Sequence, residues 1–252
     1  MLVNERHAQI LDYLFAHRYA TIDELCARVY ASPATIRRDL ADMEATGAIT
    51  RVWGGATLPG GSNIGLPQEV RLRMNETEKR RIAVAAARLI RDNTSIFLDS
   101  SSTCIHLARL LGAFRGLTVV ANGFETLAAL NRLPSSVKIV CTGGALDGHY
   151  EYIGVAAQNA LNTCRADQFF FSCGAVSAGD GITFSGEENA RIKQLMRANA
   201  REAVLLCDHS KFDASLFCRA FGFEDVNLIV TDARPENDIL YERIKDKLIV
   251  AP

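Results

Sequence analysis

Two groups of residues in this chain have the types and spacing to bind an anion. In the first, Ser32-Pro33-Ala34-Thr35-Ile36-Arg37-Arg38, two adjacent arginines follow a helix-start signal. The serine hydroxyl can accept a backbone N–H of the first turn, and proline at the next position has no N–H to leave unbonded. The exposed end of such a helix carries Thr35, Arg37 and Arg38, which suits entry into a DNA major groove. The alternative is an ordinary surface helix with two solvated arginines.

The second group is Asp99-Ser100-Ser101-Ser102-Thr103, which lies between an apolar run and a helical pattern. Free backbone N–H groups and the positive end of a helix dipole at such a turn favour a bound anion, and the hydroxyls add donors. The alternative is simple capping of the helix by Ser102 or Thr103. One cap needs a single hydroxyl, so four hydroxyl residues after an aspartate favour phosphate binding.

Further polar residues follow other apolar runs, where the ligands of a parallel sheet are usually bound. Gly143 and Gly144 would let the backbone approach a ligand, although each also fits a simple turn. A carboxylate for sugar hydroxyls beside a lysine for a phosphate is a sensible pairing, with a surface ion pair as the alternative. Besides residues 99–103, the candidate set is Asn122, Gly143, Gly144, Glu187, Lys193, Asp208 and Lys211.

Three helices precede or contain the arginine pair. The first is expected over residues 5–17, and the second begins at Thr21, which has the capping-box spacing to Glu24. The third runs from Ser32 to a left-handed C-cap at Gly47, with Ile36, Leu40 and Met43 on its apolar face.

A short hairpin follows the third helix. Two β-prone segments flank Gly54-Gly55, and a glycine pair suits a tight turn. Three helices and a hairpin make a winged helix-turn-helix over residues 1–58, in which Arg51, Trp53 and Gly54 would lie on the wing near phosphate or the minor groove.

The segment after the hairpin is rich in residues that resist regular structure. Residues 59–67 read as a loop, and we expect a linker over 59–75. A helical stretch then reaches about Arg91, with a second capping signature at Asn75 and Glu78.

The remainder, residues 76–252, alternates apolar runs with helical patterns, which predicts an α/β domain with a mainly parallel sheet covered by helices on both faces. The predicted strands are 95–99, 117–122, 137–141, 168–173, 203–208, 227–231 and 248–251, and the predicted helices are 104–111, 125–133, 155–164, 187–199 and 236–247.

The composition limits the kinds of molecule that this protein can bind. The net charge of −1, with six basic and seven acidic residues in 1–57, excludes binding of DNA through bulk positive charge. No apolar run approaches the roughly 20 residues that span a bilayer, and no signal-peptide core is present, so we expect a cytoplasmic protein without a membrane partner. Seven scattered cysteines without a CxxC pair favour buried free thiols, with no metal and no cofactor.

The motifs Thr35–Leu40, Gly47 and Arg51–Ala56 resemble the DNA-binding domain of DeoR-family bacterial transcriptional regulators. The family usually has histidine where Trp53 stands. Three further matches, at Asp99–Thr103, Thr142–Gly144 and Asp208–Phe212, extend the resemblance to the family's C-terminal domain, although that family's loop usually has glycine and threonine in place of Ser101 and Ser102. The resemblance implies a fold akin to ribose-5-phosphate isomerase and binding of a phosphorylated sugar or related metabolite.

From these observations we expect a transcriptional regulator, a repressor of a carbohydrate or polyol catabolic operon, that binds double-stranded operator DNA as a dimer or tetramer. A sugar-phosphate isomerase or deaminase with a fused helical domain is the enzymatic alternative, with Asp99, Glu187, Glu188 and Asp208 as candidate acids and bases. A sugar-phosphate sensor that does not bind DNA is a third reading.

Overall fold

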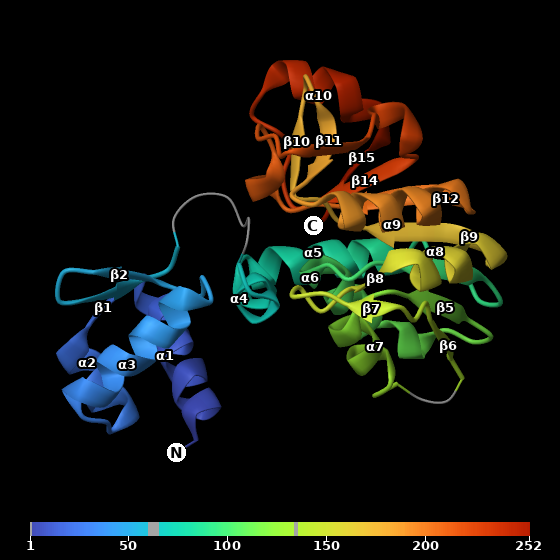
Figure 1. Cartoon of the computed structure of the whole chain (residues 1–252). Coiled ribbons are helices and arrows are strands. Elements are labelled where there is room, and N and C mark those ends of the chain that lie inside the picture. Colours follow the sequence, from blue (N-terminus) through green and yellow to red (C-terminus); the bar gives the residue numbers. More distant parts are fainter. Residues whose placement is uncertain (1, 60–65, 134–135) are drawn as a thin grey trace. The chain divides into compact units, whose positions relative to one another are not determined.

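The computed structural model describes residues 2–59, 66–133 and 136–252, which form two compact units divided between Met74 and Asn75 (Figure 1). Part of the expected linker, residues 60–65, lies outside this description. The rest of it differs from the expectation, because Leu66 and Val70 are buried in the core of the first unit. Val70 belongs to α4 (Gln68–Arg73), a short helix that packs with this unit and ends before the boundary.

The N-terminal unit contains α1 (Val3–His17), α2 (Ile22–Val29) and α3 (Pro33–Ala45). A small antiparallel sheet completes it, in the order β1 (Tyr19–Thr21), β3 (Gly55–Thr57), β2 (Thr50–Val52). Strand β1 was not predicted, since three residues are too few to show an alternating pattern. The apolar faces of the three helices meet in one core that includes Ile10, Leu25 and Ile36, all fully buried.

The predicted helix signals of this unit are confirmed. Glu24 accepts the backbone N–H of Thr21 at 2.8 Å, and Thr21 accepts that of Glu24 at 3.2 Å, which completes a capping box. Ser32 caps α3 by accepting the N–H of Thr35. At the other end Gly47 has φ +74°, and its N–H donates to Glu44 while that of Ala48 donates to Met43, a Schellman motif.

The hairpin turn is one residue earlier than expected. Trp53 and Gly54 connect β2 to β3, and the φ of +76° at Gly54 explains the glycine there. Gly55 already belongs to β3, and a Cβ at this position would lie 2.0 Å from the carbonyl oxygen of Ala20 in β1. The first glycine therefore makes the turn, and the second allows β3 to pair closely with β1.

The C-terminal unit is built on a seven-stranded parallel sheet, as predicted. All seven predicted runs form its strands, and their spatial order differs from their order in the chain. The sheet runs β15 (Leu248–Val250), β14 (Leu228–Thr231), β12 (Ala200–Leu206), β9 (Ala166–Phe171), β4 (Ser95–Leu98), β5 (Thr118–Ala121), β6 (Lys138–Cys141).

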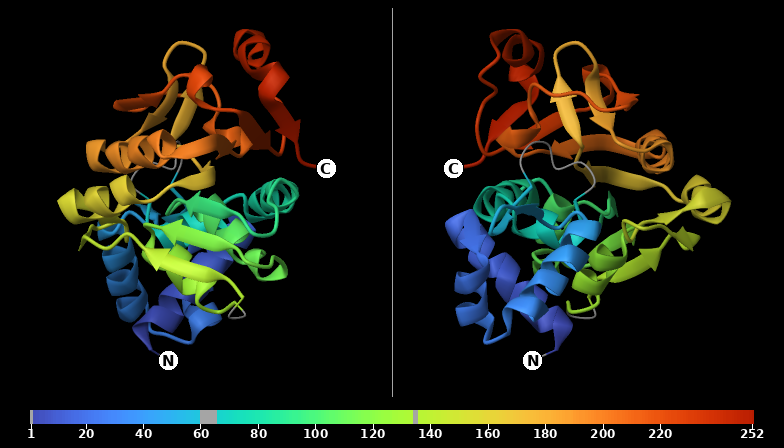
Figure 2. Two further views of the ribbon diagram at one scale, coloured as in Figure 1. Left: turned by 90° about the vertical axis from the view of Figure 1, so that its right-hand side faces the viewer. Right: turned by 60° about the vertical axis from the view of Figure 1, so that its left-hand side comes forward.

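Helices cover both faces of this sheet (Figure 2). One face packs against α8 (Gly154–Thr163) and α9 (Glu187–Ala198), in a core with Phe97, Phe169 and Phe171. Because side chains alternate along a strand, Leu98 and Phe170 lie on the opposite face. That face carries α5 (Glu76–Ala87), α6 (Ser102–Ala108) and α7 (Phe124–Leu130), which pack side by side. The helix α10 (Asp238–Ile244) connects β14 to β15.

Two small antiparallel sheets were missed by the sequence analysis, since their strands are two to four residues long. One has the order β10 (Ala175–Ser177), β11 (Gly181–Phe184), β13 (Cys218–Phe221), and the other pairs β7 (Ala145–Leu146) with β8 (Tyr152–Ile153).

The seven cysteines are free thiols. Cys104, Cys173 and Cys207 are buried as expected, whereas Cys141 on the edge strand β6 is exposed. Within the ranges given above, no helix is long and apolar enough to cross a membrane, and no cluster of three metal-binding side chains occurs.

Candidate nucleic-acid surface and ligand site

The inner face of α3 is fixed by both apolar and ionic contacts. Ile36, Leu40 and Met43 are buried in the core of the N-terminal unit. Asp39, also buried, accepts hydrogen bonds from the Arg6 guanidinium of α1 at 2.5 and 2.7 Å. Burial opposes ionisation of Asp39, but the hydrogen bonds and charge of Arg6, with help from His7, outweigh it and lower the pKa of this carboxyl. The helix is therefore held rigidly from one side.

The outer face of α3 carries the predicted arginine pair. Arg37 and Arg38 are both exposed, and neither has a hydrogen bond or ion pair with any residue that the structure describes. Ser32 and Pro33 are also exposed at the start of the helix. Thr35 is partly buried, and its hydroxyl lies 2.9 Å from that of Ser32. Two cations without partners in the described structure, close to the exposed first turn of α3, form a surface suited to phosphate and base edges.

The wing contributes less free charge than expected. The Arg51 side chain binds Glu44 of α3 at 2.7 Å, and its backbone N–H donates to the same carboxylate at 2.9 Å. Arg51 and Arg37 both line a hollow of about 320 Å³ between α3 and the wing. Trp53 is 99% exposed at the hairpin tip, next to Gly54. On the wing, the exposed Trp53 ring is therefore available to contact DNA, whereas the Arg51 side chain is already bound to Glu44.

One exposed residue near this surface was missed. Tyr30 ends α2 in a left-handed conformation, with φ 52° and 95% exposure. It directly precedes the turn into α3. A bulky residue with positive φ has no sequence signal of its own, because glycine and asparagine are the residues normally expected there.

In the C-terminal unit the loop after β4 centres on a buried carboxylate. Asp99 is fully buried and accepts the N–H of Ser101 at 2.8 Å and that of Ser172, after β9, at 3.0 Å. The cap of α6 is Ser101, which accepts the N–H of Cys104, so neither Ser102 nor Thr103 is the capping residue. Ser101 has φ −67°, a conformation that does not require the family's glycine.

The side chain of Lys193, on α9, lies next to the Asp99 carboxylate. Its ammonium group lies 3.5 Å from Asp99 and donates to Asn189 at 2.9 Å, and the side chain is only 3% exposed. Asn189 in turn donates to Glu151, which is also buried. The result is a chain of groups, with Asp99, Lys193 and Glu151 buried and Asn189 partly buried, that we call the carboxyl-edge cluster.

Two members of the carboxyl-edge cluster were missed by the sequence analysis. Asn189 precedes Lys193 by four residues, and this helical spacing is a signal that could have found it. Glu151 reaches the cluster only through tertiary structure. The predicted Glu187, by contrast, is exposed at the start of α9 and has no described contact with the cluster.

The residues that follow the neighbouring strands β5 and β6 differ in whether they have partners within the protein. The Asn122 side chain, after β5, is fully buried, and neither its oxygen nor its nitrogen has a hydrogen-bond partner in the described structure. Gly144 has φ +111°, and a Cβ there would lie 2.4 Å from the carbonyl oxygen of Ile153, so this glycine serves a close backbone approach within the protein. Gly143, with φ +66°, has open space beside it.

Asp208 and Lys211 do not join the carboxyl-edge cluster. They follow β12, which is separated from β4 by β9. Asp208 is fully buried and accepts hydrogen bonds from Asn75 and Ser210 instead. The predicted ligand residues thus fall into two groups along one edge of the sheet.

The expected cap at Asn75 was wrong. Asn75 has φ 50°, outside the conformation of an N-cap, and makes no side-chain cap to α5.

Comparisons with known proteins assign both units. Residues 6–60 match the model of the DeoR-like helix-turn-helix domain, and residues 74–233 match that of the DeoR C-terminal sensor domain. The HTH-type transcriptional repressor GlcR of Bacillus subtilis is 30% identical over 93% of this chain and 90% of its own. The L-fucose operon activator of Haemophilus influenzae is 31% identical over 93% and 94%.

Among solved structures, a ribose 5-phosphate isomerase A from Methanocaldococcus jannaschii has a TM-score of 0.41 and 20% identity over 55% of each chain. The curated relatives are named as transcriptional regulators, which sets aside the enzymatic alternative. The chain belongs to the DeoR family of helix-turn-helix transcriptional regulators, with a DNA-binding domain followed by a sensor domain.

Proposed function

We propose that this regulator binds operator DNA through α3 and the wing, in the cytoplasm and as a homo-oligomer, and represses a carbohydrate or polyol catabolic operon. The observation that carries the proposal is the exposed pair Arg37 and Arg38 on a helix whose other face is fixed by Asp39 and Arg6. Ser32, Pro33, Thr35, Trp53 and Gly54 complete the proposed contact set, and Arg51 joins it if DNA displaces Glu44.

A mobility-shift titration tests the DNA contact. The probe is a duplex that the full-length wild-type protein selects from a random-sequence pool. Arg37→Ala should weaken binding by about 10-fold or more and reduce the salt dependence, because one charged contact to base or phosphate is lost. Arg201→Ala removes the same charge from an exposed site in the sensor domain and is the matched control. Unchanged affinity of Arg37→Ala, with circular dichroism intact, would remove α3 from the recognition role.

For the sensor domain we propose a phosphorylated sugar or a related anion at the carboxyl edge of the sheet. The loop 99–103 would take the phosphate, Asn122 after the neighbouring strand β5 would take a sugar hydroxyl, and Gly143 after β6 would border the ligand on that side. The support is the Asn122 amide, which is buried without a hydrogen-bond partner in the described structure, since such a group is expected to have one. Lys193 would contribute only by sharing its ammonium group between Asp99 and the ligand. Glu187, Asp208 and Lys211 remain outer members of this proposed site.

A thermal-shift series tests the ligand class on the full-length protein. The probes are ribose 5-phosphate, fructose 1-phosphate, fructose 6-phosphate and glucosamine 6-phosphate, each beside its unphosphorylated counterpart. A ligand present at 100 times its Kd should stabilise the protein by about 2.7 kcal/mol. We expect a phosphate-dependent rise in Tm that Asn122→Ala removes. Equal rises with and without phosphate would contradict the proposed class.

A further inference from the structure

The junction between the two units is a single residue with an unusual conformation. Asn75 is the first residue of the sensor unit and follows Met74, the last of the DNA-binding unit. It has φ 50° and ψ 41°, a left-handed conformation that separates α4 from α5, whereas Met74 is extended. The direction in which the chain leaves the sensor domain therefore depends on how Asn75 is held.

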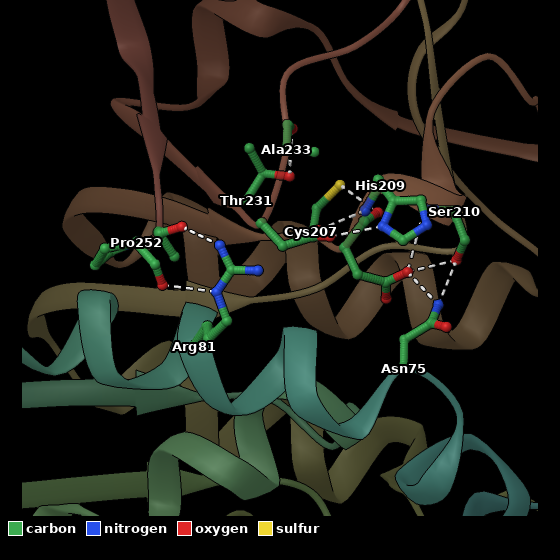
Figure 3. A network of polar contacts seen from close by, with 11 residues as sticks. Asn75, Arg81, Cys207, His209, Ser210, Thr231, Ala233 and Pro252 are labelled. Atoms are coloured by element: carbon green, nitrogen blue, oxygen red, sulfur yellow. Dashed lines mark hydrogen bonds and ion pairs between the residues drawn. The ribbon is translucent and has the colours of Figure 1, made fainter. Parts of the chain in front are cut away.

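The side chain of Asn75 is held by the loop that follows β12. Its amide nitrogen donates to Oδ1 of Asp208 at 2.9 Å and to the Ser210 hydroxyl at 3.2 Å (Figure 3). Asp208 Oδ1 also accepts the backbone N–H of Ser210. The junction is thus fixed by a residue 133 positions away in the chain.

Asp208 is a carboxylate with capacity left for another partner. It is fully buried, and its second oxygen has no hydrogen bond with any residue that the structure describes. Burial opposes its ionisation, but the charge of Lys79, a buried residue in the first turns of α5, lowers its pKa, together with the Ser210 bond and the charge of Lys211. An ionised, buried oxygen without a hydrogen bond is a group that a ligand hydroxyl would satisfy.

Farther along α5, a second side chain binds to a different part of the sensor unit. Arg81 donates to the carbonyl oxygens of Ala251 and Pro252, both at 2.6 Å, at the end of β15 (Figure 3). Asp208 instead lies at the carboxyl end of β12, and the neighbouring strand β9 is followed by Ser172, whose N–H donates to Asp99. Asn75 and Arg81 of the same helix region are therefore bound at the ends of two different strands, β12 and β15.

We propose that Asn75 is the positioning residue through which the loop 208–211 and the DNA-binding unit affect each other. This inference rests on the proposed DNA-binding function. A ligand that binds Asp208 or Lys211 changes the bond to Asn75, and the left-handed junction then changes the direction of the preceding chain. Because coupling is reciprocal, DNA bound to the N-terminal unit must also change the stability of loop 208–211.

Hydrogen exchange of the full-length protein, with and without the selected duplex, tests this coupling. In the wild type we expect exchange in residues 206–213 to change by about fivefold or more when DNA binds. Asn75→Gly keeps the positive φ but removes the amide, so this change should disappear while operator affinity and circular dichroism persist. Arg81→Ala removes the other fastening of α5 and should keep the change.

Every other outcome of the hydrogen-exchange experiment contradicts the inference. A wild-type loop that exchanges equally with and without DNA shows that it is not coupled to the operator. A response retained in Asn75→Gly, or lost equally in Arg81→Ala, shows that the asparagine bond is not the link. Failure to select any duplex would contradict the DNA-binding function itself, and the mobility-shift titration identifies that case separately.

Discussion

The cations of the two proposed binding sites have opposite surroundings. Arg37 and Arg38 on α3 are exposed and have no partner in the described structure, so a DNA phosphate can bind them without breaking an internal contact. Lys193 on α9 is buried and already bound by Asp99 and Asn189. A ligand that recruits Lys193 must share or replace these partners. In the DNA-binding unit, recognition and stability should therefore be separable, whereas in the sensor unit they should be linked.

The largest effect should come from Lys193→Met. This change leaves the buried Asp99 carboxylate without its counter-ion, and breaking such a pair costs about 3 to 5 kcal/mol. Calorimetry of the full-length protein should show this loss as a lower Tm for the sensor unit. Lys245→Met, the same change in an exposed pair with Glu242, is the control and should leave the Tm nearly unchanged. Equal losses in the two variants would contradict the comparison.

Asp39→Asn tests whether the recognition helix is also held by a buried charge. Its loss leaves Arg6, which is 13% exposed, without its partner, so we expect a destabilisation of about 2 kcal/mol, below the range for fully buried pairs. Since the pKa of Asp39 is lowered on folding, the wild type has this stabilisation above pH 4 and loses it as the pH falls through the lowered pKa.

The measurement for Asp39→Asn is the free energy of unfolding, followed by circular dichroism as a function of pH. Below that pKa the variant and the wild type should converge. Glu44→Gln, which removes the exposed partner of Arg51 on the same helix, is the control and should change stability little. If the free energies of unfolding of Asp39→Asn and the wild type differ as much at low pH as at neutral pH, the charge of Asp39 is not the cause of the difference.

The smallest effect should come from His209→Asn in the sensor unit. Asp232 accepts the bond from the His209 ring at 2.6 Å and raises the pKa of the imidazole, against a smaller opposing effect of burial. The pair stabilises the fold fully below the unfolded pKa of about 6.5, and this contribution disappears as the pH rises through the raised folded pKa. Because the ring is 51% exposed, the contribution should stay below about 1 kcal/mol.

Unfolding of the wild type and His209→Asn at pH 6 and pH 9 checks this prediction. The wild type should lose slightly more stability than the variant between these values. A loss as large as that of Lys193→Met would show that exposure does not govern the strength of ion pairs in this unit.

Local signals were sufficient for much of the fold. The caps at Thr21 and Ser32 and the stop at Gly47 form as predicted, because each depends on residues within four or five positions. The five inner strands of the large sheet were found because both of their faces are covered, which leaves continuous apolar runs in the sequence. The exposed arginine pair followed from the helical period of the apolar residues around it.

Local signals failed where a side chain has a distant partner. Asn75 fits a capping signature, but it adopts a left-handed conformation and its amide nitrogen donates to Asp208 instead. Arg51 has the right place on the wing, but Glu44 binds it. Lys193 was expected to offer its charge to a ligand, and instead it balances the buried Asp99. In each case, the preference of a short segment is overridden by a charge or carboxylate that folding brings near.

The sequence by itself determined the three helices of the first unit, the seven strands of the large sheet and the recognition face of α3, since hydrophobic runs, periodicity and capping are local. Only the tertiary structure decided which strands are neighbours, and so which polar ends share a site. The order β12, β9, β4 separates Asp208 from Asp99, and the packing of α5 brings Asp208 to Asn75. The physical reason is that buried charges must find partners, and the fold, rather than distance along the chain, supplies them.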